Sequence, residues 1–127
     1  MSDDGDKLGL YLGDFLTHAD RIGRLAGLGR AAFDGDEFLR YAAEALLVRS
    51  GEIVARIDQA FPEFADQHPE LELRELKATR NVIAHGYDVV DYMIVWEVVS
   101  VDIPRAADAV RAVLSAGGQG SGPVSPT

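Results

Sequence analysis

The 127-residue chain contains no cysteine. This absence excludes disulfides, cysteine-ligated zinc, iron–sulfur clusters and thiol nucleophiles, and it is compatible with a reducing compartment without proving one. Basic residues are also scarce, because 12 Lys and Arg stand against 21 Asp and Glu, for a formal net charge of -9. Such a charge argues against a generally basic protein that coats nucleic acid, since the molecule as a whole repels phosphate. A small basic cleft remains compatible with it.

Long apolar runs are missing as well. No uninterrupted run approaches the roughly 18–20 residues that a membrane span needs, and the start of the chain is acidic where a signal peptide would be basic and then apolar. We therefore expect a cytoplasmic protein with no membrane partner. The content of 47% hydrophobic and 26% charged residues is typical of a globular domain.

Composition also predicts the domain boundaries. Residues 1–6 are polar and acidic, and residues 117–127 consist largely of Gly, Ser and Pro. Neither segment has much to bury, so we expect a disordered N-terminal tail, one helical domain over 7–116 and a flexible C-terminal tail.

Helical periodicity dominates the domain. Between Lys7 and Leu28 apolar residues recur every three or four positions, which predicts a first helix. Asp36 is a suitable N-cap for a second helix, in which Ser50-Gly51 marks either a bend or a close helix crossing. Pro62 and the segment before Pro69 end this helix, and a third helix is predicted from about residue 71 to a glycine cap at 86.

The segment from Val89 to Ile103 gives conflicting signals. Its β-branched and aromatic residues favour a strand by propensity, whereas its length and the possible cap Asp91 favour a helix that continues to about residue 114. Pro104 should then kink or split that helix. We expect an all-α protein, with Trp96 in its core or at a dimer interface.

The residues with the clearest chemistry end the third helix, in the sequence Arg80-Asn81-Val82-Ile83-Ala84-His85-Gly86-Tyr87. A permanently charged guanidinium and an imidazole that titrates near neutrality come to the same helix end, with a phenol two residues later. This trio suits a phosphodiester, because the arginine binds the phosphate oxygens and the histidine moves a proton.

This region resembles the HEPN superfamily, and specifically the HepT-like toxins of HEPN/minimal-nucleotidyltransferase (HepT–MntA, type VII) toxin–antitoxin modules. Their signature Arg-x-x-x-x-His-x-Tyr is met by Arg80, His85 and Tyr87. The similarity is greatest over residues 68–104 and weaker over the first two helices. The chain departs from the family pattern at residues 45–52.

The resemblance implies an up-and-down bundle of four to five helices that forms a homodimer with a shared cleft. It implies a metal-independent, cofactor-free endoribonuclease, in which the ribose 2′-OH attacks the adjacent phosphate and leaves a 2′,3′-cyclic phosphate. RNA and not DNA would be the substrate. Arg80 and His85 would be catalytic, Asn81 supporting, and Tyr87 the residue that a nucleotidyltransferase antitoxin modifies with AMP.

Other interpretations of these residues remain open. Arg80 could pair with Asp88 or a helix carbonyl, and Tyr87 could be a buried aromatic residue. A metal site formed by His85, Asp88 and Asp91 is not favoured, because these residues span an expected helix break. The chain could also be a non-catalytic HEPN module that binds a nucleotidyltransferase partner or a nucleotide.

Local charge adds one expectation about RNA binding. Within residues 71–87, Arg74, Lys77 and Arg80 outnumber Glu72 and Glu75, so this helix is predicted to be a locally positive surface on an acidic body. The other two histidines, His18 and His68, have no such context and are expected in surface or turn positions.

Overall fold

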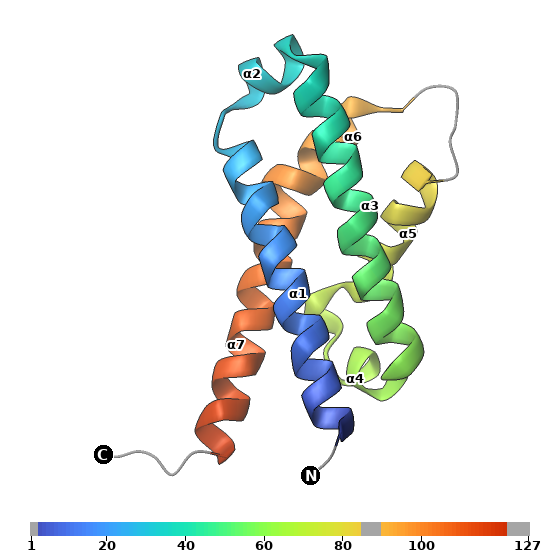
Figure 1. Cartoon of the computed structure of the whole chain (residues 1–127), viewed down its shortest axis with the longest axis vertical. Helices are drawn as coiled ribbons and strands as arrows, with labels where there is room; N and C mark the ends of the chain where they lie inside the picture. The colour runs from blue at the N-terminus through green and yellow to red at the C-terminus, as the bar shows by residue number, and fades with distance from the viewer. Residues whose placement is uncertain (1–2, 85–89, 122–127) are drawn as a thin grey trace.

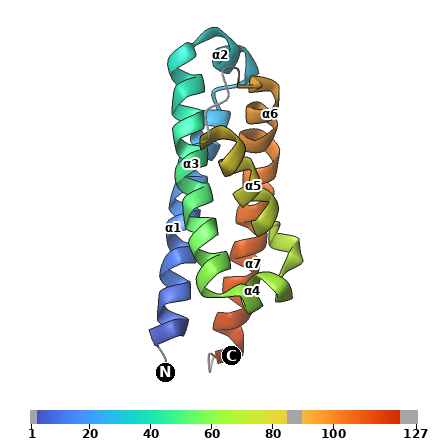
Figure 2. The same cartoon turned by 90° about the vertical axis from the view of Figure 1, so that its right-hand side faces the viewer.

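The computed structural model describes residues 3–84 and 90–121, and the described part is helical, with no strand. Three long helices form its framework: α1 (Asp3–Ala26), α3 (Glu37–Ala60) and α7 (Ile103–Ser121). Helix α1 packs against both α3 and α7, and α5 (Leu73–Ala84) lies along the other side of α3. Figures 1 and 2 show this up-and-down arrangement, with both termini at the same end of the bundle. The predicted all-α bundle is thus confirmed.

The core is formed by one face of each long helix. In α1 the buried residues keep the predicted spacing of three and four. Burial of each large apolar side chain contributes roughly 1.5–3 kcal/mol. The most completely buried side chains include Phe15, Ile22, Phe33, Val54, Ile57, Leu71, Val95, Val99, Ile103 and Val110.

The second predicted helix is α3, and its cap is the predicted one. The Asp36 carboxylate accepts a hydrogen bond from the Phe38 backbone N–H at 2.9 Å, which satisfies one of the free N–H groups of the first turn. The apolar residues in the first half of α3 do not all face the core. Phe38, Tyr41 and Ala45 are exposed, while Ala43 and Leu47 are buried.

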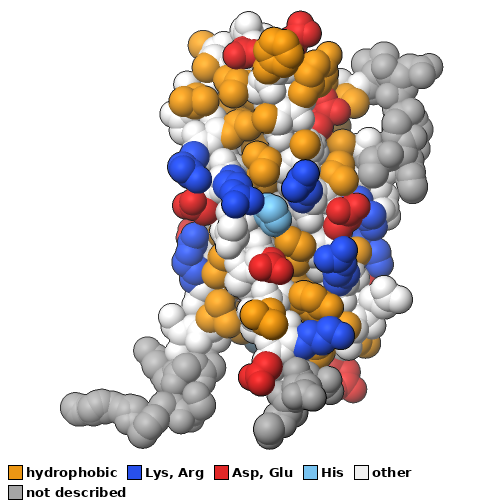
Figure 3. Space-filling view, viewed as in Figure 1, with side chains coloured by type: hydrophobic (Ala, Val, Ile, Leu, Met, Phe, Trp, Pro, Cys, Tyr) orange, Lys and Arg blue, Asp and Glu red, His pale blue; other side chains and the backbone are white. Residues whose placement is uncertain are grey.

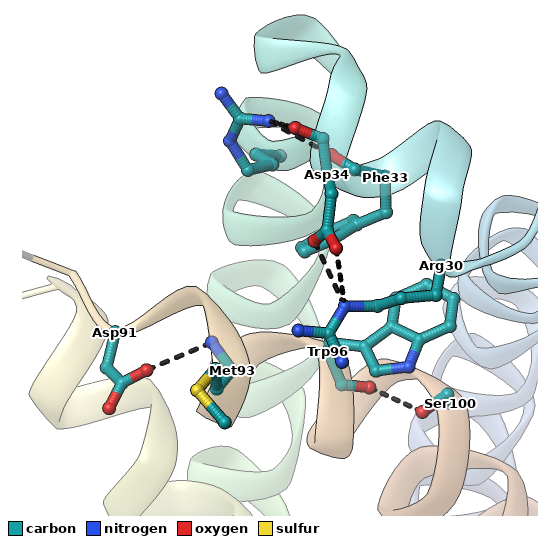
Figure 4. A network of polar contacts seen from close by, with 8 residues as sticks. Arg30, Phe33, Asp34, Asp91, Met93, Trp96 and Ser100 are labelled. Atoms are coloured by element: carbon teal, nitrogen blue, oxygen red, sulfur yellow. Dashed lines mark hydrogen bonds and ion pairs between the residues drawn. The ribbon is translucent and has the colours of Figure 1, made fainter.

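A short helix, α2 (Arg30–Gly35), closes one end of the bundle and was not predicted. Phe33 of α2 is buried, and its ring centroid lies 5.1 Å from that of Trp96 in α6 (Tyr92–Glu97). Figure 4 shows the neighbouring interactions, in which Arg30 donates to the Asp34 carboxylate and lies over the Trp96 ring. Trp96 therefore contributes to the core, one of the two roles expected for it.

A second short helix, α4 (Pro62–Gln67), and the 3-10 turn η1 (Pro69–Leu71) lie between α3 and α5. The expectation was that Pro62 would only end a helix, but Pro62 also begins α4. Proline is suited to the first helical position, because its missing N–H would be unpaired there in any case.

The segment with conflicting signals is helical. Asp91 caps α6 as predicted, by accepting from the Met93 N–H at 2.9 Å. Helix α6 continues through a π-helical turn, η2 (Val98–Asp102), directly into α7. The wider turn ends two residues before Pro104, which cannot donate a backbone hydrogen bond. The irregularity expected from Pro104 is thus a π-turn within a continuing helix.

The ends of the bundle extend beyond the boundaries drawn from composition, since α1 begins at Asp3 and α7 ends at Ser121. The flexibility of the two tails stays a prediction. Across the described ranges, the helices are too short or too polar to cross a membrane.

Candidate functional site

Arg80 lies on α5 at a close crossing with α3, and Gly51 makes this crossing possible. A Cβ atom placed on Gly51 would lie 2.1 Å from the Cβ and 2.4 Å from the Cγ of Arg80. Side-chain atoms do not approach so closely, so only glycine fits at this position. Of the two interpretations given to Ser50-Gly51, the close helix crossing is the one observed.

Two polar atoms at this crossing lack hydrogen-bond partners among the described residues. They are the buried Nε of Arg80 and the buried Oγ of Ser50, whose residue is only 2% exposed. An unsatisfied buried polar group costs about 1–3 kcal/mol, so such groups are few in folded proteins and call for an explanation, of which a functional role is one. Arg80 thus combines a stem held against α3 with a charge that no described carboxylate neutralises.

A shallow groove of about 530 Å³ lies between α3 and the end of α5. Ile83 contributes the α5 side, three residues after Arg80 and two before His85 in the sequence. Asn81 is half-buried on the same helix end. The α3 side is formed by Glu44, Ala45, Val48, Arg49 and Glu52.

The chain returns to the same groove at the start of α6. The Tyr92 hydroxyl donates a hydrogen bond to the carboxylate of Glu44, one of the groove residues. This bond, together with burial, raises the pKa of Tyr92 to about 12, so the phenol stays protonated at neutral pH. The chain is therefore attached to α3 on both sides of segment 85–89, by the Gly51–Arg80 crossing before it and by Tyr92 after it.

The predicted site residues His85 and Tyr87 lie outside the described residues, as does Asp88. The expected roles of His85 and Tyr87, and a pairing of Arg80 with Asp88, stay predictions. Asp91 serves as the cap of α6. In the described ranges there is no cluster of three side chains suited to hold a metal ion.

The predicted positive surface on α5 is offset by acidic neighbours from other helices. Lys77 donates to the Asp58 carboxylate at 3.1 Å, and Arg74 bridges Asp58 at 3.2 Å and Asp66 at 2.9 Å. These cations are neutralised by carboxylates of α3 and α4, which sequence spacing could not reveal. Arg80 is the basic residue of α5 that has no ion pair with any described residue.

The two described histidines differ in their environments. His68 lies in the turn before η1, where its Nδ1 is 2.9 Å from a carboxylate oxygen of Glu70, as a turn position predicts. His18 is half-buried on α1, and its Nδ1 has no partner among the described residues. Burial lowers the pKa of His18, and the charges of Arg21 and Arg49 lower it further.

An exposed apolar patch lies beside the site and was missed, because its residues were assigned to the helical faces that build the core. We define the α3–α6 patch as Phe38 and Tyr41 of α3 with Met93 and Ile94 of α6. These side chains are 55–74% exposed. Helices α3 and α6 contact each other, and Tyr92 and Glu44 link them next to the patch. Large apolar groups gathered in this way indicate an interaction surface.

Comparison with known proteins identifies the family. A sequence model described as "Ribonuclease HepT-like" matches residues 15–113, which include α5 and its Arg80. The chain belongs to the HepT-like ribonuclease family. The matched region of this HepT-like chain runs from Phe15, within α1, to Val113, within α7, and so includes part or all of each helix of the framework.

Individual relatives of this HepT-like protein agree with the assignment. A protein of Caldanaerobacter subterraneus named "Putative RNase TTE0752" is 31% identical over 73% of this chain and 80% of its own. "Putative RNase MJ1380" of Methanocaldococcus jannaschii is 28% identical over 64% of this chain and 72% of its own. "Probable ribonuclease HepT" of Thermococcus cleftensis is 34% identical over 46% of this chain and 54% of its own. No solved structure gives a significant match.

Proposed function

We propose that this protein is an endoribonuclease that cleaves RNA at the groove between α3 and α5. The observation that carries the proposal is Arg80, whose stem is fixed by the Gly51 crossing and whose charge is left without a described partner. Such a preorganised cation suits the negative charge that develops on a phosphate during transfer. Membership in the HepT-like ribonuclease family and the names of the relatives support this assignment.

The proposed chemistry uses the substrate's own nucleophile. His85 accepts the proton of the ribose 2′-OH, the 2′-oxygen bonds to the adjacent phosphorus, and the bond from phosphorus to the 5′-oxygen breaks. The departing 5′-oxygen takes up a proton, which leaves a 2′,3′-cyclic phosphate and a 5′-hydroxyl end. Arg80 stabilises the phosphorane charge, and Asn81 helps to orient the phosphate or the imidazole. The reaction is proposed to need no metal or cofactor.

We further propose that the protein works as a homodimer. The α3–α6 patch is adjacent to Glu44, which lines the groove, so a second copy seated on it would bring two grooves together. Two copies of His85 in one cleft provide both a proton acceptor and a proton donor. The patch residues are exposed apolar and aromatic side chains of the kind that the core of an interface buries.

The proposed biological role is that of a cytoplasmic toxin in a toxin–antitoxin module. A nucleotidyltransferase antitoxin would transfer AMP to the hydroxyl of Tyr87, which adds bulk and phosphate charge two residues from His85 and repels the RNA backbone. The alternative is a non-catalytic module that binds the nucleotidyltransferase or a nucleotide.

One set of proteins tests both functions. We expect the purified protein to cleave RNA in the presence of EDTA, with His85→Ala slower by about 10²–10⁴-fold and Arg80→Ala slower by about 10²–10³-fold. Cleavage is followed on a labelled RNA, and a matched strand with 2′-deoxyribose should be resistant.

Intact-mass spectrometry of the protein co-expressed with a nucleotidyltransferase should show an added AMP that Tyr87→Phe abolishes. If His85→Ala and Arg80→Ala both cleaved RNA at the wild-type rate, the nuclease proposal would be wrong.

A further inference from the structure

Four arginines of this acidic protein have no ion pair within the described residues. They are Arg21, Arg49, Arg56 and Arg80. The other cations are engaged: Lys7 lies over the Tyr11 ring, Arg40 donates to backbone carbonyls, and the remainder form ion pairs. The ion-paired group comprises Arg24, Arg30, Arg74, Lys77, Arg105 and Arg111. With 21 acidic residues in the chain, arginines left unpaired are the exception.

Three of these arginines lie on the surface formed by α1 and α3. Arg49 and Arg56 are seven residues apart on α3, which places them on one face of the helix and about 10.5 Å apart along its axis. Arg21 lies on α1, which packs against α3. All three are exposed. Figure 3 shows Lys and Arg side chains on both sides of a histidine in the middle of this surface.

His18 of α1 lies close enough to the arginines of both helices for their charges to lower its pKa. It stands one turn before Arg21 on α1, and its ring interacts electrostatically with both Arg21 and Arg49. The buried Nδ1 of His18 has no partner among the described residues. One acidic group, Asp14, also faces the ring. Glu44 and Glu52 line the groove with Arg49, so the cluster has acidic neighbours on the α3 side as well. His18, Arg21 and Arg49 still bring three cationic or protonatable groups near one another without an ion pair to any of these carboxylates among the described residues, an arrangement that suits a bound anion.

Arg49 also belongs to the groove of the proposed active site, where it lies opposite Ile83. The cluster and the groove are therefore continuous through one residue. An RNA strand with its scissile phosphate in the groove can extend over Arg49 onto the α1–α3 surface. Guanidinium groups bind such phosphates well, because their donors match the phosphate oxygens in pairs.

We propose that His18, Arg21 and Arg49, with Arg56 further along α3, form a track that binds phosphates of the RNA strand beyond the scissile bond. This inference rests on the proposed ribonuclease function and assigns substrate binding to the α1–α3 surface, in place of the neutralised cations of α5. The ligand is the sugar-phosphate backbone, so the track contributes affinity without base specificity.

His18 provides a second property of the track. Its pKa is lowered mainly by burial, so the ring is neutral near pH 7 in the free protein. A phosphate placed beside it favours the imidazolium and raises that pKa. RNA binding is therefore coupled to proton uptake, and the affinity should increase as the pH falls from 7 toward 6. His18→Gln should reduce this pH dependence.

The test uses a short 2′-O-methyl RNA, which lacks the nucleophile and cannot be cleaved, with binding measured by fluorescence anisotropy at several salt concentrations. We expect Arg21→Gln and Arg49→Gln each to weaken binding several-fold and to reduce the slope of log K against log salt by about 0.7 for each phosphate that the variant no longer binds. Arg111→Gln removes the same charge from an exposed ion pair on α7 and should leave both quantities unchanged.

The results separate this inference from the nuclease proposal. If cleavage of unmodified RNA depends on His85 but Arg49→Gln binds the 2′-O-methyl RNA as tightly as Arg111→Gln, the proposed track is wrong and the nuclease proposal is retained. If the wild type binds the 2′-O-methyl RNA through Arg21 and Arg49 but cleaves no RNA, the track is supported and the nuclease proposal is wrong. A wild type that neither binds nor cleaves RNA overturns both. Equal circular dichroism spectra establish that each variant is folded.

Discussion

At the scale of single residues, Gly51 determines where Arg80 can lie. Gly51→Ala would place a Cβ 2.1 Å from the Arg80 Cβ, so α5 or the arginine must move, at a cost of about 1–3 kcal/mol. Displacement of a catalytic group by 1 Å can cost about 10²-fold in rate. We expect kcat for RNA cleavage to fall at least about tenfold while KM changes less, because the proposed phosphate track is formed by residues of α1 and α3, whereas the substitution displaces Arg80 of α5.

Gly13→Ala is the matched control for this substitution. Gly13 lies in the middle of α1, and a Cβ at that position meets nothing within 4 Å. Alanine there should stabilise the helix by about 0.5–1 kcal/mol and leave kcat unchanged. Steady-state kinetics and urea unfolding of both variants provide the comparison. A Gly51→Ala protein with the kcat of the wild type would show that the crossing does not position Arg80.

The residue scale also shows what the sequence could and could not predict. The caps Asp36 and Asp91 were predictable, because a cap is recognised by the residues immediately around it. The sequence marked Ser50-Gly51 as unusual but could not name Arg80 as the neighbour, since that proximity depends on how two helices cross. The same limit applies to His18, whose burial depends on its position against α3.

At the scale of secondary-structure elements, the packing of α3 against α5 is strengthened by Asp58. Its carboxylate accepts from Lys77 and Arg74 across the helix pair, and the hydrogen bond from Lys77 is the main reason that the pKa of Asp58 is lowered. A lowered carboxyl pKa means that the stabilisation is present above the unfolded value near 4 and is lost as the pH falls through and below it.

Asp58→Asn tests this arrangement. We expect it to lower the free energy of unfolding at pH 7 by about 1 kcal/mol, a value reduced by the partial exposure of both partners. The difference from wild type should shrink as the pH falls below about 4, where the wild-type carboxylate is protonated as well. Urea unfolding followed by circular dichroism at each pH measures this. The control is Asp108→Asn, which removes a carboxylate from an exposed pair with Arg111 and should change the free energy of unfolding by less than about 0.5 kcal/mol at either pH. If the free energy of unfolding of Asp58→Asn stayed parallel to that of the wild type across this pH range, the expectation would be contradicted.

Elements also differ in how well periodicity predicts them. The long helices α1 and α3 were predictable because their apolar spacing persists over many turns. The six-residue helices α2 and α4 are too short for such a pattern. Periodicity also could not separate the core face of α3 from its exposed apolar face, because Phe38 and Tyr41 repeat with helical spacing like residues of the core.

At the scale of the whole molecule, the net charge of -9 does not reveal that some basic residues form ion pairs while others do not. Two of the three basic residues of α5 that stood out in the sequence form ion pairs, whereas Arg21 of α1 and Arg49 and Arg56 of α3 have no ion pair within the described ranges. Spacing along the chain records which charges are close in sequence, but pairing depends on neighbours from other helices. A dominant acidic surface with one basic track would restrict RNA to that track and make binding salt-sensitive.

The size of the assembly is the final property at this scale. Phe38 is 74% exposed and Met93 is 69% exposed in the α3–α6 patch, and an isolated chain gains nothing from presenting these groups to water. We expect the wild type to sediment as a dimer in analytical ultracentrifugation and Phe38→Glu to shift it toward the monomer, with a loss of RNA cleavage that higher protein concentration partly restores. Leu10→Glu places the same charge on an exposed apolar residue of α1, which is 68% exposed and outside the patch, so it should remain a dimer. A monomeric wild type, or equal dimerisation of the two variants, would mean that this patch does not join two copies.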